Sequence, residues 1–198
     1  MNGYHDQKML LQAIVESSDD AIASKTLDGI VTSWNPGAER IFGYTAAEMI
    51  GRSVTKIFPP DRLGEEAEFL RRLARGEHVD HYETVRLRKD GSSVDVSVTL
   101  SPLRDAAQTV VGASKIARDI TARKRAEALL HERYEFWRVT LSSIGDAVIA
   151  TDSGGRVTFM NGHAQSLTGW SMVDADGRPL SGVFVIINEL YGDRKSVV

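Results

Sequence analysis

The stretch Asp28-Gly-Ile-Val-Thr-Ser-Trp-Asn-Pro-Gly-Ala38 contains, in direct succession, the signals of a turn, a strand and a helix start. Gly29 accepts the positive φ of a tight turn. Residues 30–34 are rich in β-branched and aromatic side chains, which favour a strand. Asn35, followed by proline, can cap the next helix. Residues 21–25 precede the turn with a similar pattern, so we expect the two strands to form a hairpin.

This pattern returns later in the chain at a constant spacing. Asn161 repeats Asn35 at an offset of 126 residues (161 − 35), and other positions repeat at the same offset without a gap. Such a repeat indicates two copies of one structural unit. The further pairs are Ala21 and Ala147, Gly29 and Gly155, Gly43 and Gly169, and Gly51 and Gly177.

The two copies differ in extent, because the second stops where the first has reached Gly64. We therefore expect a complete domain over residues 19–120 and the N-terminal half of a second domain over residues 145–191. Residues 192–198 have no counterpart in the first copy and are expected to be a non-native or disordered tail.

The remaining periodicities predict the other elements of the first copy. Residues 1–18 hold Met9, Leu10 and Ile14 at helical spacing, which predicts an amphipathic helix. Residues 61–75 carry apolar side chains at the same spacing. Thr45 and Glu48 form a capping box that starts another short helix.

Three strands follow the helices. Residues 79–87 read as a strand, and Asp90-Gly91 is a strong hairpin turn signal. The return strand alternates valine with polar residues from Val94 to Leu100, which is typical of an antiparallel strand with one buried face. Residues 110–117 form a last strand. The order predicts an α+β fold, a five-stranded antiparallel sheet with short helices gathered on one face.

Four motifs in order make the first copy resemble the PAS family. They are the opening stretch, Phe42-Gly-Tyr44, Arg88-Lys-Asp-Gly-Ser92 and Arg118-Asp-Ile-Thr-Ala-Arg-Lys-Arg-Ala-Glu127. The resemblance implies a strand order 2-1-5-4-3 and a ligand pocket between the sheet and the helices. It also implies sensing, dimerisation and signal relay to a histidine kinase, a cyclic-dinucleotide enzyme or a transcription regulator. Asp119 and Thr121 look like the family's signal-exit motif.

The lining of such a pocket is expected from apolar side chains on strands and helices. PAS pockets hold flavin, haem, small acids or nothing. The chain has no cysteine, which excludes a cysteine-adduct flavin. Glu65 stands where haem sensors of the family carry a histidine, which disfavours histidine-ligated haem; no cofactor is otherwise evident. The expected lining residues are Ile22, Trp34, Phe42, Phe69, Leu73, Val85, Val98 and Ile116.

The linker over residues 121–144 favours a helix, because it is rich in Ala, Leu, Glu and Arg and lacks Gly and Pro. Its apolar residues are spaced 4-3-4-3, as in a coiled-coil seam. We expect a homodimer through this helix, through faces of the PAS unit, or through both. The alternative is an amphipathic helix that packs on its own domain. The seam residues are Leu130, Tyr134, Trp137, Leu141 and Ile144.

The composition and motifs of the chain exclude several classes of partner and activity. The net charge of −3 and the lack of a long apolar run argue against nucleic-acid and membrane partners. Phosphate-binding loops, nucleophile elbows and metal-ligand helices are missing, so we expect no enzyme activity.

His78 and His81 are expected on opposite strand faces, with His81 beside Val79 and Val85. We expect a cytoplasmic sensing and dimerisation module; the alternatives are a structural interaction module with an empty pocket and a flavin or haem sensor.

Overall fold

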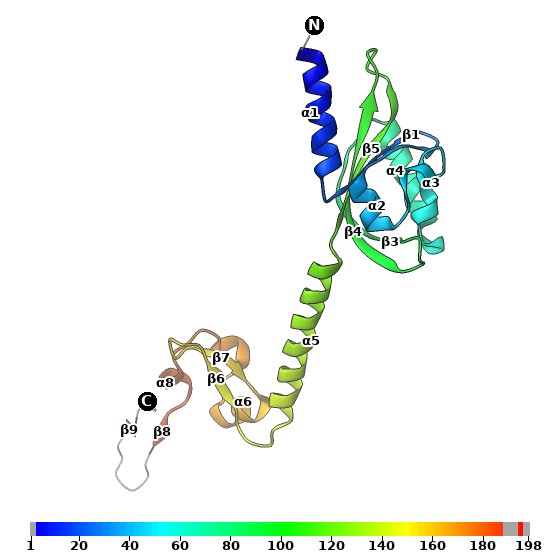
Figure 1. The fold of residues 1–198 in the computed structure, drawn as a ribbon. Helices are drawn as coiled ribbons and strands as arrows, with labels where there is room; N and C mark the ends of the chain where they lie inside the picture. The colour runs from blue at the N-terminus through cyan, green and yellow to red at the C-terminus, as the bar shows by residue number, and fades with distance from the viewer. Residues whose placement is uncertain (1–2, 188–193, 196–198) are drawn as a thin grey trace. The chain divides into compact units, whose positions relative to one another are not determined.

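The computed structural model describes residues 3–187 and 194–195 of the chain (Figure 1). The chain divides into two compact units between Ala126 and Glu127. Helix α5 begins in the first unit and ends in the second.

The first unit contains a five-stranded antiparallel sheet in the order β2-β1-β5-β4-β3. Short helices follow the first hairpin and gather on one side of the sheet (Figure 1), which is called the inner face here. This confirms the predicted fold class and strand order. The elements are α1 Gly3–Ser17, β1 Ala21–Thr26, β2 Val31–Trp34, α2 Pro36–Phe42, α3 Ala46–Met49, the 3-10 helices η1 Val54–Ile57 and η2 Pro60–Arg62, α4 Leu63–Ala74, β3 Val79–Leu87, β4 Ser93–Arg104 and β5 Val110–Asp119.

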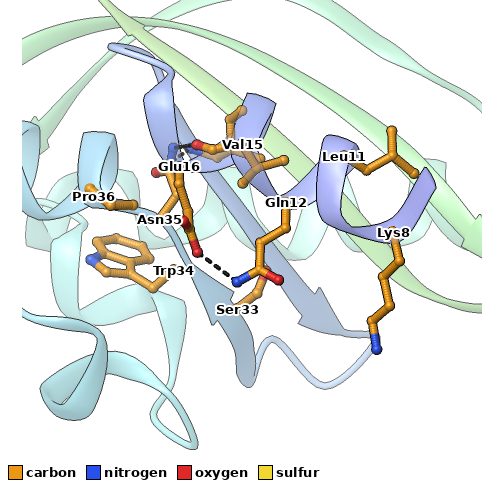
Figure 2. A pocket seen from close by; sticks show the side chains of 10 residues that line it. Lys8, Leu11, Gln12, Val15, Glu16, Ser33, Trp34, Asn35 and Pro36 are labelled. Carbon is orange, nitrogen blue, oxygen red and sulfur yellow. Dashed lines mark hydrogen bonds between the residues drawn. The ribbon is translucent and has the colours of Figure 1, made fainter. Parts of the chain in front are cut away.

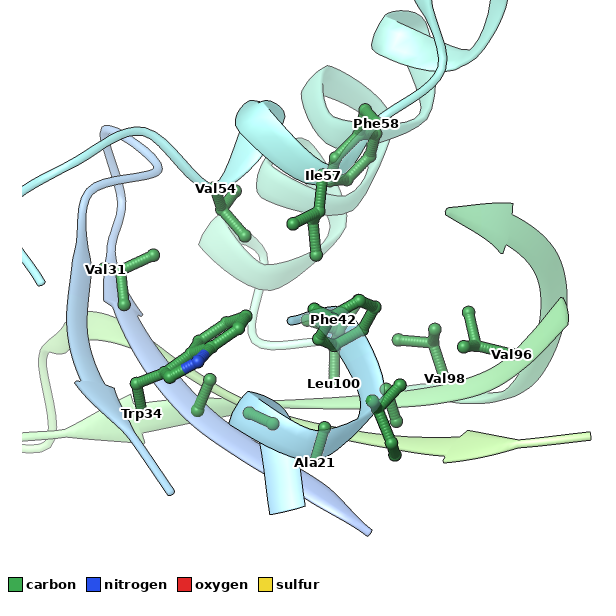
Figure 3. Close-up of a cluster of buried hydrophobic side chains, with 14 of the residues drawn as sticks. Ala21, Val31, Trp34, Phe42, Val54, Ile57, Phe58, Val96, Val98 and Leu100 are labelled. Carbon is green, nitrogen blue, oxygen red and sulfur yellow. The ribbon is translucent and has the colours of Figure 1, made fainter. Parts of the chain in front are cut away.

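The core lies between the inner face and these helices (Figure 3). Val94, Val96, Val98 and Leu100 of β4 are almost fully buried, as the alternating pattern predicted. Full burial of one such side chain contributes about 1.5–3 kcal/mol. In α1, by contrast, Met9, Leu10 and Ile14 remain 56–62% exposed, so the predicted helix forms without burying this apolar set.

A single amide organises the start of the unit. Asn35 Oδ1 accepts the N–H groups of Ile22, at 2.9 Å, and of Ala38, at 2.8 Å. Its Nδ2 donates to the carbonyls of Val15, at 2.8 Å, and of Asp20, at 3.1 Å. The capped helix must approach β1 closely, and a Cβ on residue 37 would lie 2.3 Å from the Asp20 carbonyl oxygen. Glycine at position 37 is therefore required by space.

A bulge in β3 changes which side chains face the core. The pairing with β4 shifts after Val79, and His81 adopts a positive φ of 48°. Beyond the bulge, Thr84 is buried and Val85 is not. The expectation that His81 and Val85 share the face of Val79 is therefore wrong. One extra residue in a strand moves every following side chain to the opposite face.

The second unit repeats the opening of the first. Asn161 Oδ1 accepts from Val148, at 3.0 Å, and Ala164, at 2.9 Å, as Asn35 does in the first copy. A small core lies between β7 and the helices. The elements are α5 Thr121–Ser143, the antiparallel pair β6 Ile149–Thr151 and β7 Val157–Met160, then α6 Gly162–Thr168, α7 Met172–Ala175, α8 Leu180–Val183, β8 Ile186–Ile187 and β9 Arg194–Lys195.

Of the tail over residues 192–198, Arg194 and Lys195 pair with Ile187 and Ile186. The rest of the tail lies outside the described residues. Among the described residues, no helix has an apolar stretch long enough to span a membrane.

Replacing Asn35 by Ala should destabilise the first unit by about 2–4 kcal/mol, because a helix cap is lost and buried backbone groups lose their partners. Hydrogen exchange at the amides of residues 23–26 would measure this change. Asn161→Ala is the matched control and should affect residues 148–160 only. Equal effects of both variants on both units would contradict the assignment.

Candidate functional site

Five of the eight expected lining residues meet in one buried cluster. They lie on β2, α2, α4 and β4, and each is at most 7% exposed. The rings of Trp34 and Phe42 are 5.5 Å apart, and the Trp34 indole donates to the Tyr44 carbonyl at 3.0 Å. The five are Trp34, Phe42, Phe69, Leu73 and Val98.

The other three, Ile22, Val85 and Ile116, do not face the core. Ile22 and Ile116 are direct partners across β1 and β5, and Ile116 is 43% exposed. Val85 pairs with Asp95 on the same outer face. Their expected place in an internal pocket is therefore corrected. The bulge in β3 explains why Val85 faces outward. On β1 and β5, alanine and lysine side chains face the core in place of the expected isoleucines.

Ile22 instead borders a groove of about 460 Å³ between α1 and the outer face of the first hairpin (Figure 2). Leu11 and Val15 of α1 form one wall, and Trp34 and Pro36 lie opposite. Ile116 borders a separate hollow of about 240 Å³ together with His81.

The inner face of the sheet carries a buried charged cluster, which consists of Lys25 on β1, Lys115 on β5, Arg86 on β3, and Glu65 and Glu66 on α4. The three cationic residues are at most 6% exposed. Lysine and arginine are almost never this buried without partners. Sequence analysis did not identify this cluster, because only apolar residues were considered for the core.

Two of the cations have carboxylate partners. Lys25 forms a buried ion pair with Glu66. Arg86 donates from one terminal nitrogen to Glu65 at 2.8 Å and from the other to Thr84 Oγ1 at 2.9 Å. Glu65, the residue at the haem-histidine position, is therefore engaged by an arginine.

Lys115 has no such partner among the described residues. Its ammonium lies 5.5 Å from the centre of the Phe58 ring, and the Arg86 guanidinium lies 3.7 Å from the same centre. Burial, followed by the nearby charges of Arg86 and Lys25, lowers the pKa of Lys115 to about 7. Burial also lowers the pKa of Lys25, although Glu66 opposes this shift. Lys115 therefore changes protonation state near neutral pH.

The predicted exit motif forms a hydrogen-bonded junction at the start of α5. Asp119 accepts from the Thr121 amide at 2.8 Å and from Arg88 at 3.0 Å. Arg88 also donates to the carbonyl of Ile41, at the end of α2. Thr121 Oγ1 accepts from the Asp95 amide at 3.1 Å. Burial raises the pKa of Asp119, but the hydrogen bonds from Thr121 and Arg88 outweigh it and lower that pKa.

Four of the five seam residues lie on α5, which contains no buried residue, and Ile144 follows directly after the helix ends at Ser143. Leu130, Tyr134 and Trp137 are 60–68% exposed, and Ile144 is 37% exposed. Leu141 is half-buried, and its carbonyl accepts from Asn161 at 3.2 Å. Within residues 3–187 and 194–195, no three His, Asp or Glu side chains gather as metal ligands.

Comparison with protein families finds two matches. A family profile described as "PAS domain" matches residues 19–122, and one described as "PAS fold" matches residues 135–195. The PAS domain of a protein from Colwellia psychrerythraea has a similar structure, with a TM-score of 0.54 and 28% identity. The similarity covers 59% of this chain and 98% of that domain.

The chain spans about a quarter or less of the length of three curated relatives that it matches. Two-component system protein A of Emericella nidulans is 35% identical over 119 residues, covering 59% of this chain and 17% of the relative. The signal transduction histidine-protein kinase AtoS of Escherichia coli is 27% identical over 166 residues, covering 82% of this chain and 26% of the kinase. The probable diguanylate cyclase DgcE of Escherichia coli is 35% identical over 75 residues, covering 38% of this chain and 6% of the relative.

Replacing Lys115 by Met should stabilise the first unit at pH 7 by about 1–4 kcal/mol, since a buried unpaired charge is removed. The pKa of Lys115 is near 7 in the folded protein and has its ordinary value of 10.5 in the unfolded chain, so the stability of the wild type rises with pH between these two values. The variant should lack this rise. Unfolding curves from pH 6 to 10 would measure it.

Lys56→Met is the matched control, because Lys56 is exposed and also lies over an aromatic ring, 4.3 Å from the centre of Tyr44. This control should keep the wild-type pH dependence. If the free energy of unfolding changed with pH in the same way in wild type and Lys115→Met, Lys115 would not be a destabilising buried cation.

Replacing Asp119 by Ala should loosen the first turn of α5, because the Thr121 amide and Arg88 lose their acceptor. We expect a loss of about 0.5–2 kcal/mol in protection of the amides of residues 121–124. Hydrogen exchange with mass spectrometry would detect it. Asp90→Ala, which removes a comparable turn carboxylate, should leave α5 unchanged. Unaltered exchange in Asp119→Ala would rule out the junction.

Proposed function

The chain belongs to the PAS family, and from this premise we propose that it is a sensing and dimerisation module of a signal transduction protein. Its two PAS units resemble those of histidine kinases and diguanylate cyclases. We propose that the chain acts without catalysis of its own, in the cytoplasm, and that its output depends on a small ligand or a conformational signal received by the first unit.

The observation that carries this proposal is the attachment of α5 at both ends. Asp119 and Thr121 bind its first residues to the end of β5 and to β4. Near the other end, Asn161 donates to the carbonyl of Leu141 and accepts from the amide of Val148, the residue just before β6. A change in the first unit that shifts the junction would therefore be passed along a continuous helix.

We propose that two copies of α5 pair through the seam. The exposed Leu130, Tyr134 and Trp137 follow the 4-3 spacing of coiled-coil core positions. Burial of these side chains between two helices would remove a large apolar surface from water. Pairing would also allow a twist or shift at one end of the helices to reach the other end.

Trp137→Glu should weaken this homodimer at least tenfold, because two glutamates would face each other in the seam. Val139→Glu is the matched control, since Val139 is 59% exposed and lies outside the seam. Light scattering coupled to size-exclusion chromatography over a range of concentrations would measure both. A wild-type monomer throughout, or equal dissociation of the two variants, would refute dimerisation through α5.

A further inference from the structure

A hollow of about 250 Å³ in the second unit corresponds to the core of the first unit. Each of the six residues that line it stands 126 positions after a core residue of the first unit that is at most 8% exposed. Figure 3 shows four of these core residues packed together. In the second unit, by contrast, Leu167 is 69% exposed. The lining residues are Ala147, Ile149, Leu167, Thr168, Leu180 and Phe184, and their counterparts are Ala21, Ala23, Ile41, Phe42, Val54 and Phe58.

The strand that borders this hollow has an open edge. In the first unit, β1 pairs with β2 on one side and with β5 on the other. Its counterpart β6 pairs with β7, and no described strand lies on the other side of β6. β1 begins at Ala21, which pairs with Ala117 of β5, whereas β6 begins only at Ile149. The second unit therefore lacks, among its described residues, the neighbour that β5 provides for β1.

The backbone at this edge is positioned to accept a further strand. The amide and the carbonyl of Val148 both bond to Asn161, on the side of β7. Backbone groups of successive strand residues point to opposite sides, so those of Ala147 and Ile149 point to the open edge. An unpaired edge beside an exposed apolar surface is typical of a site that pairs with another chain.

We propose that β6 pairs antiparallel with β6 of a second copy of the chain about a two-fold axis, with Ile149 opposite the partner's Ile149. The two hollows would then join into one apolar core. This inference goes beyond the proposed pairing of α5, because it uses a different surface of the chain.

The order of side chains along β6 favours a second copy as the occupant. In the first unit, β1 pairs with Ala113, Lys115 and Ala117 of β5, which present a small, a long and a small side chain to the inner face. Residues 147, 149 and 151 are alanine, isoleucine and threonine, which also place the longest side chain in the middle. Antiparallel pairing centred on Ile149 would therefore give β6 a neighbour with the same order of side-chain sizes.

The charges of the two units also favour self-pairing of the second. Lys25 of β1 occupies the position that corresponds to Thr151, and it forms a buried ion pair with Glu66. Thr151 and the six lining residues of the hollow carry no charge. A two-fold axis brings each surface against its own copy, so an uncharged surface meets no like charge there. Burial of the exposed Leu167 would contribute to association.

The first test measures self-association of the full chain carrying Trp137→Glu, which disables the α5 seam. Sedimentation over a range of concentrations should still show a monomer–dimer equilibrium. Leu167→Glu, added to this chain, should raise the dissociation constant at least tenfold, because each hollow would then bury a charge. Val173→Glu is the matched control and should leave association unchanged, since Val173 is 89% exposed in the same unit and does not line the hollow.

Charge exchange at Ile149 tests the register, again in the chain carrying Trp137→Glu. Ile149→Lys alone and Ile149→Glu alone should each lose association, because like charges would lie directly opposite each other. An equimolar mixture of the two variants should restore the dimer. Variants that merely failed to fold would not recover on mixing.

Hydrogen exchange locates the contact. The amides of residues 147 and 149 should exchange more slowly as the concentration of the Trp137→Glu chain rises. The amides of residues 21 and 23, which β5 already covers, should show no such dependence.

Three results would each overturn the inference. They are a Trp137→Glu chain that stays monomeric at every concentration, unchanged association after Leu167→Glu, and no recovery in the mixture of Ile149 variants. None of them bears on pairing through α5. Conversely, association that Trp137→Glu leaves at the wild-type level and Leu167→Glu abolishes would support the β6 contact and refute the α5 seam.

Discussion

The amide of Asn35 is the constraint on which the rest of the first unit depends. It joins the last turn of α1, the start of β1 and the first turn of α2 through four backbone hydrogen bonds. Buried backbone groups must find partners, and here one side chain supplies them for three elements. Asn161 makes the same connections in the second unit, where the helix that precedes the hairpin is α5. The incoming helix of the second unit is thus the outgoing helix of the first.

Hydrogen bonds also attach the start of α5 to the first unit. The first turn of α5 is bound by Asp119 and Thr121, which also contact Arg88 and β4. Arg88 in turn reaches the end of α2. Hydrogen bonds through Arg88 and Asp119 therefore connect the end of α2 to the first turn of α5. The bonds made by Arg88 and Asp119 are charge-assisted, a class that is shorter and stronger than neutral hydrogen bonds.

The charged inner face is unusual for a small domain, because burial of Lys25, Arg86 and Lys115 opposes folding. Proteins commonly violate the rules of core composition at functional sites. Glu65 and Glu66 compensate for two of the cations, and Phe58 provides a ring face for Arg86 and Lys115.

The sequence by itself determined the hairpin, the Asn35 cap, the alternation along β4 and the second copy at a constant offset. These features depend on local backbone preferences and on periodicity, which a sequence displays directly. It did not determine which residues of β1, β3 and β5 face inward. Ile22 and Ile116 appeared to be better core residues than their neighbours, yet short alanines and long lysines occupy the inner face. That choice was made by the tertiary structure, because α4 supplies carboxylates opposite the lysines and the bulge at His81 turns Arg86 toward them. Ion pairs between distant elements accompany the inward placement of Lys25 and Arg86, and no local pattern records such pairing.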